Sequence, residues 1–429
     1  MKKVAFITLG CKVNTYETEG MKRIFEENGY EVVDFGALAD VCVINTCTVT
    51  HLSDKKSRQM IRRARRINPN AIVAAVGCYA QVAPDEVSNI EGVNLVIGNN
   101  HKADIVRLVN EASHNTQKTE VSERKCLSEY EKLWIDSYSE RIRAILKIQD
   151  GCDQFCSYCI IPYARGSVRS RNSEDIINEA RRLSENGFTE IVLTGIHLTS
   201  YGKDTGDESL VNVLCNLNGL KGIKRIRLGS IEPLYMSQEL IRTLSGLEKL
   251  CPHFHLSLQS GCDETLMRMN RRYTTSEYMD IVNNIRKNFL NPAITTDIMV
   301  GFPGETEEEF KKTCSFVEKV GFSRAHIFQY SIRKGTKAAG MPNQISPEIK
   351  EKRSRILIDI CEKSKNNYRD QYLGKVMEVL FENEKESLWE GHTVNYIPVR
   401  VASKTPLSGT ICSVKLIEKR GDFVLGQIS

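Results

Sequence analysis

An apolar run leads directly into three cysteines in the segment Arg143-Ala-Ile-Leu-Lys-Ile-Gln-Asp-Gly-Cys-Asp-Gln-Phe-Cys-Ser-Tyr-Cys159. The first seven residues have the composition of a buried strand. The cysteines Cys152, Cys156 and Cys159 follow with the spacing C-x3-C-x2-C. We therefore expect all three thiols to lie on the loop that leaves the carboxyl end of this strand.

Three thiols at this spacing predict an iron–sulfur site. Thiolates are soft ligands suited to iron–sulfur clusters, and a four-iron cube needs four ligands. A cube held at three corners leaves one iron free to bind a substrate or cofactor. The alternatives are a zinc knuckle, which would need a fourth ligand, and three unrelated buried thiols. We favour the open cluster because the spacing is tight.

This cysteine motif resembles the signature of the radical S-adenosylmethionine (SAM) enzymes, whose open iron chelates the amino and carboxylate groups of SAM. The resemblance implies a 4Fe-4S cluster on the three cysteines and SAM as a cofactor. Tyr158 stands just before the last cysteine. The resemblance implies that its side chain lies beside the adenine of SAM.

Length and composition exclude several classes of protein. A chain of 429 residues is too long for one ordinary domain, so two or three are expected. It has no stretch of roughly twenty apolar residues and no signal peptide, which predicts a cytoplasmic protein without a membrane partner. Its fourteen cysteines are then reduced thiols, some of them metal ligands, rather than a disulfide framework.

Positive charge is concentrated between residues 51 and 70, although the net charge of the whole chain is only +5. Ile61, Ala64 and Ile67 recur at near-helical spacing, so this stretch predicts an amphipathic helix with a basic outer face. Phosphate backbones attract such a face, and the alternative is a face that is only solvated. We take Arg62 and Arg63 as candidate RNA contacts.

Residues 1–112 alternate strand and helix patterns, which predicts an α/β domain with a largely parallel sheet. Cys11, Cys47 and Cys78 each follow a strand end. They can converge at the carboxyl edge of the sheet and form a second site with three thiols. Packing within the core is the alternative, and it is favoured for Cys42 inside a strand. The expected strands are 3–9, 41–45, 71–77 and 93–98, and the expected helices are 17–27 and 52–67.

Residues 113–140 form a polar connector, and a strand-then-helix unit repeats six times within residues 141–370. This predicts an incomplete (β/α)6 barrel with its reactive groups at the carboxyl ends of the strands. The polar residues at these ends that we expect in the SAM pocket, unless they only cap loop backbone, are Thr194, Gly195, Ser257 and Gln259. The expected strands are 144–148, 190–194, 225–229, 253–258, 294–300 and 325–330.

Residues 371–429 contain short alternating runs, which predict a small all-β barrel. Expected strands cover 376–381, 396–401, 410–418 and 423–428. The stretch carries seven basic and seven acidic residues, which argues against strong electrostatic binding of RNA by this domain.

Together these segments resemble the methylthiotransferases, a radical SAM family with a cluster-binding amino-terminal domain, a radical SAM barrel and a carboxyl-terminal, OB-like TRAM barrel. The resemblance covers essentially the whole chain. Besides the cysteine run at 151–159, it rests on Leu9-Gly-Cys-Lys-Val-Asn14, Asn45-Thr-Cys-Thr-Val49, Val76-Gly-Cys-Tyr-Ala-Gln81, His255-Leu-Ser-Leu-Gln-Ser-Gly261, Met269-Asn-Arg-Arg-Tyr273 and Asp297-Ile-Met-Val-Gly-Phe-Pro-Gly-Glu-Thr306.

The resemblance implies an activity and a second cofactor site. Cys11, Cys47 and Cys78 would hold an auxiliary 4Fe-4S cluster. Both clusters would serve insertion of a methylthio group at carbon 2 of an adenine, with one SAM as radical source and another as methyl donor. The run at 10–14 is most similar to the branch that acts on N6-threonylcarbamoyladenosine at position 37 of tRNA. Isopentenyladenosine in tRNA and an aspartate of a ribosomal protein stay open as substrates.

The implied partners are a tRNA anticodon stem-loop, an electron donor of flavodoxin or ferredoxin type, and a sulfur source. Arg165, Arg169 and Arg171 lie just past the cysteine motif and are candidates to hold the anticodon stem. Pairing with acidic residues of neighbouring helices is the alternative for these arginines. From a different functional class, an iron–sulfur electron carrier or a zinc-stabilised RNA-binding module without catalysis also stays open.

Overall fold

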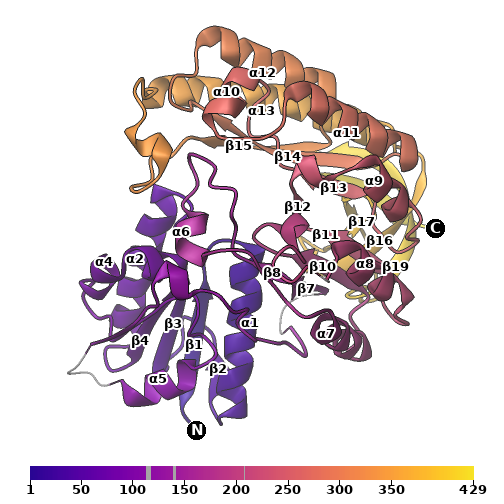
Figure 1. The fold of residues 1–429 in the computed structure, drawn as a ribbon. Helices are drawn as coiled ribbons and strands as arrows, with labels where there is room; N and C mark the ends of the chain where they lie inside the picture. Colours follow the sequence, from indigo (N-terminus) through magenta and orange to yellow (C-terminus); the bar gives the residue numbers. More distant parts are fainter. Residues whose placement is uncertain (113–116, 139–141, 207) are drawn as a thin grey trace.

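The computed structural model describes residues 1–112, 117–138, 142–206 and 208–429 (Figure 1). An amino-terminal α/β domain, indigo to purple in Figure 1, lies beside a larger central barrel. A small carboxyl-terminal barrel, in yellow, packs against the central one behind β10 and β11. The predicted fold class is confirmed.

The amino-terminal domain is built on a sheet of six parallel strands in the order β2-β1-β3-β4-β5-β6. Both faces of the sheet are buried, which is why its strands read as nearly continuous apolar runs. The strands are β1 (Lys3–Thr8), β2 (Glu31–Val33), β3 (Val41–Thr46), β4 (Ile72–Gly77), β5 (Leu95–Ile97) and β6 (Lys118–Glu120).

Helices cover the two faces of this sheet. Helices α1 (Lys12–Glu27) and α5 (Ile105–Glu111) share a core with β1 and β3, in which Phe25 and Leu108 are buried. On the other face lie α2 (His51–Ile67), α3 (Cys78–Val82) and α4 (Pro84–Ser88), and Ile61 and Ala64 of α2 point into that core as their spacing predicts.

The segment expected to be an irregular connector differs from that expectation. Residues 118–120 form β6, which pairs in parallel with β5 and extends the sheet. Leu133, Ile135 and Tyr138 are buried in the core of the central barrel. Only short stretches here have an apolar pattern, so the sequence alone showed little of this packing.

The central barrel has two parallel sheets, β11-β10-β7 and β12-β13-β14-β15. β11 and β12 are the two halves of one strand on either side of Gly229, so six strands form the open barrel, as predicted. They are β7 (Arg143–Lys147), β10 (Glu190–Thr194), β11 (Arg225–Leu228) with β12 (Ser230–Ile231), β13 (His253–Leu256), β14 (Ala293–Val300) and β15 (Arg324–Gln329).

Helices cover the outside of the central barrel. Two of them begin with a capping box, in which Thr274 pairs with Glu277 and Thr306 with Glu309. The helices are α7 (Ser173–Glu185), α8 (Leu210–Gly219), α9 (Gln238–Ser245), α10 (Asp263–Arg268), α11 (Thr275–Asn288), α12 (Glu307–Val320) and α13 (Pro347–Asp370). A short hairpin of β8 (Gln149–Asp150) and β9 (Arg169–Ser170) follows β7 and encloses α6 (Ile161–Arg165).

The carboxyl-terminal strands close into a barrel in the order β16-β17-β18-β20-β19. This barrel packs against the amino ends of the central strands, where Arg225 and Arg227 donate to the backbone carbonyls of His392 and Val394. The strands are β16 (Val376–Lys385), β17 (Leu388–Thr393), β18 (Pro398–Val401), β19 (Ile411–Arg420) and β20 (Phe423–Ile428). None of the helices in the described ranges is both long and apolar enough to cross a membrane.

Candidate functional site

The loop that carries the first cysteine set is fixed by backbone contacts. Gly151 has a φ of 71°, and a Cβ there would meet the carbonyl oxygen of Ser167 at 1.8 Å, so only glycine fits. Within the loop, the Cys152 amide donates to Gly166 O (3.0 Å) and the Cys159 amide donates to Cys156 O (2.9 Å).

The three thiols of this loop lie close enough together to influence one another. Burial and, to a smaller extent, negative charge on Cys156 raise the pKa of Cys152 and of Cys159 to about 12. A bound iron reverses this effect, because a metal ion deprotonates a coordinating thiol. The three-thiol donor set therefore fits an iron–sulfur cluster.

Arg271 lies beside this motif and was not among the predicted site residues. Its guanidinium donates to Cys156 Sγ (3.4 Å) and to Glu232 Oε2 (2.6 Å). It also donates to the backbone oxygen of Ser257 (3.3 Å), which accepts from the Tyr273 hydroxyl as well (2.6 Å). The paired arginines in the run at 269–273 were the available signal, but the spacing gave no hint of their partner.

The residues predicted for the SAM pocket all lie at the carboxyl ends of barrel strands. Gly195 packs closely on Gln149, since a Cβ would come within 2.7 Å of the Gln149 side-chain oxygen. Gln259 has a φ of 65° and exchanges backbone hydrogen bonds with Asp297 and Met299 of β14. The Thr194 carbonyl accepts from the Ile148 amide, and Ser257 shares Arg271 with Cys156.

Tyr158 occupies a different environment from the strand-end residues. It is half-buried against an apolar cluster that contains Met269, Phe302 and Tyr330. Burial raises the pKa of its hydroxyl well above the usual value. Its contact with SAM stays a prediction, as do those of the four strand-end residues.

The second cysteine set comes from three adjacent strands. Cys11 follows β1, Cys47 follows β3, and Cys78 begins α3 directly after β4. Because β1, β3 and β4 are neighbours in a parallel sheet, their carboxyl ends bring the three thiols to one edge, as predicted. Cys42 lies inside β3 and packs in the core.

The local structure around these cysteines is tightly constrained. Gly10 has a φ of 100°, and a Cβ at this position would stand 2.9 Å from Cys47 Sγ. The Asn14 amide donates to the carbonyls of Leu9 (2.8 Å) and Thr46 (2.9 Å), which ties two strand ends together. Burial and, to a smaller extent, negative charge on Cys78 raise the pKa of Cys47 to about 11. Three thiols on a glycine-lined edge fit an auxiliary cluster.

Helix α6 joins the two cysteine sets. It begins two residues after Cys159 and ends at Arg165, whose Nε donates to Cys78 Sγ (3.3 Å). The same guanidinium donates to Glu17 Oε1 (2.7 Å) on α1 and to Asp150 Oδ2 (3.0 Å) on β8. One five-residue helix therefore connects a thiol of the second set to the loop of the first.

Further buried charges complete this interface. Lys147 donates to Glu17 (2.8 Å) and to Asp150 (2.7 Å), and Lys102 stands 3.4 Å from Glu17. Burial alone would raise the pKa of Glu17, but Arg165, Lys102 and Lys147 outweigh it and hold that pKa well below its usual range. No local sequence pattern predicts this network, because its members are far apart in the chain.

The structure contradicts the predicted RNA contacts of Arg165, Arg169 and Arg171. All three are buried, with 0%, 2% and 5% of their surface exposed. Arg169 donates to the Leu127 carbonyl (2.7 Å), and Arg171 pairs with Glu179 (2.5 Å). The alternative of acidic partners is correct, because the polypeptide after the cysteine motif turns into the domain interface.

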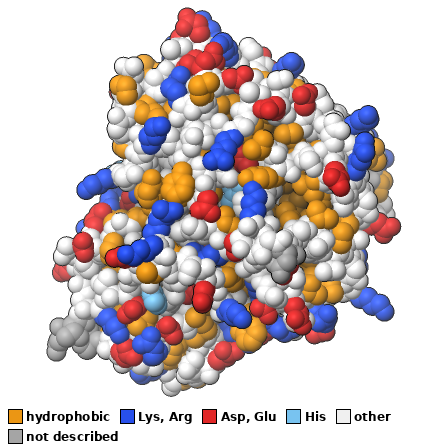
Figure 2. Space-filling view, viewed as in Figure 1, with side chains coloured by type: hydrophobic (Ala, Val, Ile, Leu, Met, Phe, Trp, Pro, Cys, Tyr) orange, Lys and Arg blue, Asp and Glu red, His pale blue; other side chains and the backbone are white. Residues whose placement is uncertain are grey.

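The other RNA candidates, Arg62 and Arg63, are exposed on α2 and stay predictions. Figure 2 shows Lys and Arg side chains interspersed with Asp and Glu over the face on which the amino-terminal domain and the central barrel meet. That face therefore carries no single uniform basic patch.

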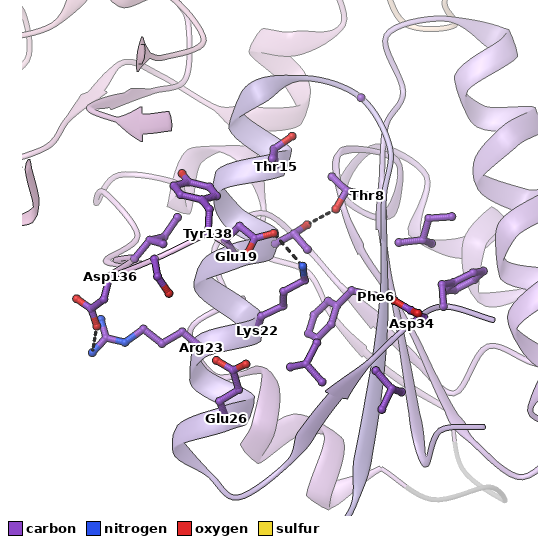
Figure 3. Close-up of a pocket in the computed structure, with 18 residues that line it drawn as sticks. Phe6, Thr8, Thr15, Glu19, Lys22, Arg23, Glu26, Asp34, Asp136 and Tyr138 are labelled. Atoms are coloured by element: carbon purple, nitrogen blue, oxygen red, sulfur yellow. Dashed lines mark hydrogen bonds and ion pairs between the residues drawn. The ribbon is translucent and has the colours of Figure 1, made fainter. Parts of the chain in front are cut away.

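A cavity of about 820 Å³ lies against the amino-terminal domain, beside α1 (Figure 3). Two ion pairs lie in its wall, Lys22 with Glu19 (2.9 Å) and Arg23 with Asp136 (3.2 Å). Gly10 also lines this cavity, and it stands next to Cys47. The cavity therefore comes close to the second cysteine set at Gly10, while Cys47 and Cys78 themselves are buried.

The amino-acid sequence matches two known families. Residues 146–317 match the Radical SAM superfamily, and residues 3–98 match the Uncharacterized protein family UPF0004. Among solved structures, the radical SAM methyltransferase TsrM of Kitasatospora setae aligns with a TM-score of 0.58 and 15% identity over 79% of this chain and 77% of that chain. At this identity the likeness shows the fold alone.

Curated relatives cover nearly the full length of the chain. The threonylcarbamoyladenosine tRNA methylthiotransferase MtaB of Bacillus subtilis (strain 168) is 42% identical, over 100% of this chain and 96% of the relative. The tRNA-2-methylthio-N(6)-dimethylallyladenosine synthase of Caldicellulosiruptor saccharolyticus is 35% identical, over 100% of this chain and 92% of the relative. A match of this extent shows that the chain belongs to the methylthiotransferase family of radical SAM enzymes, which use SAM and 4Fe-4S clusters.

Proposed function

We propose that this enzyme inserts a methylthio group at carbon 2 of N6-threonylcarbamoyladenosine at position 37 of tRNA, in the cytoplasm. The observation that carries the proposal is the link through α6, which brings the two three-thiol sets to one interface. The choice of nucleoside is supported by the 42% identity to MtaB, against 35% to the dimethylallyladenosine synthase quoted above.

The residues of the two sites divide the work between them. Cys152, Cys156 and Cys159 would hold the cluster that supplies the electron for SAM cleavage, and the other three cysteines would hold the cluster that carries the sulfur. The positively charged guanidinium of Arg271 donates a hydrogen bond to Cys156 Sγ, and Glu232 fixes the orientation of that guanidinium. A hydrogen bond to a ligand sulfur is one of the means by which a protein tunes a cluster.

The interface between the domains positions the two sites and excludes water. The Nε of Arg165 donates to Cys78 Sγ, and its Nη1 donates to the carboxylates of Glu17 and Asp150. Because these carboxylates are buried and ionised, the charge network is stable only when the domains are docked. Docking therefore keeps the sulfur-carrying site and the SAM-cleaving site at a fixed separation.

Two partners are part of the proposal. An electron donor of flavodoxin or ferredoxin type would reduce the clusters. A sulfur source would reload the auxiliary site from the exposed side, where Cys11 is accessible and Gly10 opens onto the cavity beside α1.

The test is expression of the gene in a bacterium that lacks its own threonylcarbamoyladenosine methylthiotransferase, followed by mass spectrometry of digested tRNA. We expect the 2-methylthio derivative of threonylcarbamoyladenosine, and none of it with the Cys47→Ala enzyme. If only the dimethylallyladenosine derivative forms in a suitable host, the proposed nucleoside is wrong while the reaction class holds.

A further inference from the structure

Helix α2 carries positive charge along one exposed side. Ile61 and Ala64 point into the core, so the opposite side of the helix faces solvent. Side chains three or four residues apart share a helix face, and the exposed cations of α2 recur at such intervals. We call them the basic stripe, and its members are Lys55, Lys56, Arg62, Arg63 and Arg66. A helix of 17 residues is about 25 Å long, so the stripe is long enough to follow several phosphates of a nucleic acid.

No acidic side chain of α2 offsets the basic stripe. The one acid of this helix, Asp54, is only 6% exposed and pairs with Arg333 (2.5 Å). None of the five stripe cations forms an ion pair with another described residue. Arg63 lies over the Phe35 ring, 5.9 Å from its centroid. Charge of one sign without carboxylate partners is suited to a polyanion.

The stripe begins where the amino-terminal domain contacts the central barrel. The amide of His51, the first residue of α2, donates to Ser331 Oγ (3.1 Å) just beyond β15. From the same barrel segment, Arg333 donates to Asp54 Oδ2 (2.5 Å) and to Thr48 Oγ1 (2.5 Å). Thr48 directly follows Cys47, so this domain contact stands beside the second cysteine set.

Large apolar side chains stay exposed around this domain contact. In the amino-terminal domain, Val49 and Leu52 expose 50% and 71% of their surface. In the central barrel, Phe328 and Ile332 expose 46% and 52%. Each lies within three residues of one of the two residues that share the 3.1 Å hydrogen bond. Single exposed apolar residues are ordinary, but four at one domain contact indicate an interaction site. We call these four residues the apolar seam.

The aromatic member of the seam is connected to the first cysteine set. β15 is the edge strand of its sheet, and Phe328 is the register partner of Met299 on β14. Met299 packs against an apolar cluster, and Tyr158 packs against the same cluster. Tyr158 directly precedes Cys159. The apolar seam therefore extends from the surroundings of the first cysteine set to those of the second.

An RNA stem-loop offers matching groups to both surfaces. Its stem presents a regular backbone of phosphates, which basic side chains bind. Its loop presents unstacked bases, which proteins bind by stacking on aromatic side chains. A stem that lies along the basic stripe places its loop at the apolar seam, where both cysteine sets are near.

We propose that the anticodon arm of tRNA docks across this surface, with the stem backbone on the basic stripe and bases of the loop on the apolar seam. Phe328 stacks on one of these bases. The inference rests on the proposed function, for which it supplies the docking surface of the substrate. It also places Arg62 and Arg63 within a larger surface that both domains build.

The basic stripe is tested by equilibrium binding of a synthetic anticodon stem-loop to the reconstituted holoenzyme at several salt concentrations. Each phosphate contact contributes about 0.7 to 0.9 to the slope of log K against log salt concentration. The double variant Lys55→Gln/Lys56→Gln should therefore bind more weakly, with a slope smaller in magnitude by about 1.4 to 1.8. The matched control Lys311→Gln/Lys319→Gln removes two exposed lysines of α12 and should keep the affinity and the slope of the wild type.

The apolar seam is tested with two RNAs, the stem-loop and a fully paired duplex of the same length. Phe328→Leu keeps an apolar side chain but removes the ring. It should raise the Kd of the stem-loop by at least about fivefold, the lower end of the range for one base stacked on an aromatic ring, and leave the Kd of the duplex unchanged. Phe328→Tyr keeps the ring and should bind both RNAs as the wild type does. The lysine double variant should weaken both RNAs, because both present phosphates.

Wild-type affinity and salt slope of the lysine double variant, or equal losses of Phe328→Leu on the stem-loop and the duplex, would overturn the inference. If Phe328 packed against SAM instead, Phe328→Leu would raise the KM for SAM and leave RNA binding unchanged. If the stripe bound an acidic electron-donor protein instead, the lysine double variant would bind RNA normally and would be slow with the protein donor but not with dithionite.

A failure of the proposed function would be visible separately, because the readout here is RNA binding. A wild-type enzyme that binds the stem-loop with these differences but leaves threonylcarbamoyladenosine unmodified would contradict the proposed nucleoside and not the docking surface.

Discussion

The two cysteine sets are built in opposite ways. The first occupies one loop of eight residues, and its geometry is fixed by contacts within and just beyond that loop. The second gathers one thiol from each of three strands and depends on the strand order of a whole domain. A cluster site can therefore be encoded locally or by topology, and the two designs should fail differently when they are disturbed.

The largest expected difference concerns the ligands themselves. Cys152→Ala should abolish reductive cleavage of SAM, because the cluster that supplies the electron loses one of its three cysteine ligands. Cys78→Ala should abolish methylthiolated product while some SAM cleavage continues. Chromatographic assay of 5'-deoxyadenosine beside nucleoside analysis measures both. Equal loss of SAM cleavage in the two variants would contradict the proposal that only the first cysteine set serves SAM cleavage.

A substitution of Arg165 tests whether the two cysteine sets depend on one shared domain interface. Arg165→Met leaves Glu17 and Asp150 buried without their main partner, so we expect a loss of about 3–5 kcal/mol in the free energy of unfolding, measured by urea titration. Arg62→Met is the matched control, since Arg62 is exposed on α2, and its change should stay within about 0.5 kcal/mol. A loss below about 1 kcal/mol for Arg165→Met would show that docking does not depend on this network.

A substitution of Gly10 tests the second cysteine set alone. Gly10→Ala forces a Cβ to within 2.9 Å of Cys47 Sγ at a φ of 100°, which we expect to cost about 1–3 kcal/mol and to lower iron bound at the auxiliary site. Gly29→Ala has a positive φ of 78° with nothing within 4 Å, so it isolates backbone strain from collision. Iron analysis and electron paramagnetic resonance should show loss in the first variant only. Similar iron content in both would contradict a steric role for Gly10.

A substitution of Arg271 tests the first cysteine set, and we expect the smallest effect from it. Arg271→Lys keeps the charge but cannot bond Cys156, Glu232 and Ser257 at the same time. We expect SAM cleavage to slow by about tenfold, the effect of one charge-assisted hydrogen bond, and the reduction potential of this cluster to shift. The auxiliary signal in a redox titration should not move, and a shift of both signals would indicate a general loss of structure.

The sequence predicted what depends on periodicity and motif. The strand and helix pattern gave the three-part architecture, because apolar periodicity reports which face of an element is buried. It also predicted that Cys11, Cys47 and Cys78 lie at one edge of the sheet, because strand ends of a parallel sheet share an edge, while cluster binding by both cysteine sets stays a prediction. It could not place Arg165, Arg169 and Arg171, because their partners Glu17 and Glu179 come from elements whose docking no local pattern encodes.

The buried charges on α1 have a consequence for synthesis of the chain. Glu17 meets Arg165 only 148 positions later in the sequence. At about 5–20 residues per second, a ribosome needs roughly 7 to 30 seconds to make that stretch. During this interval Glu17 has Lys102 of its own domain as a cationic partner but lacks Arg165 and Lys147, so its final packing must wait for translation of a segment that belongs to the next domain.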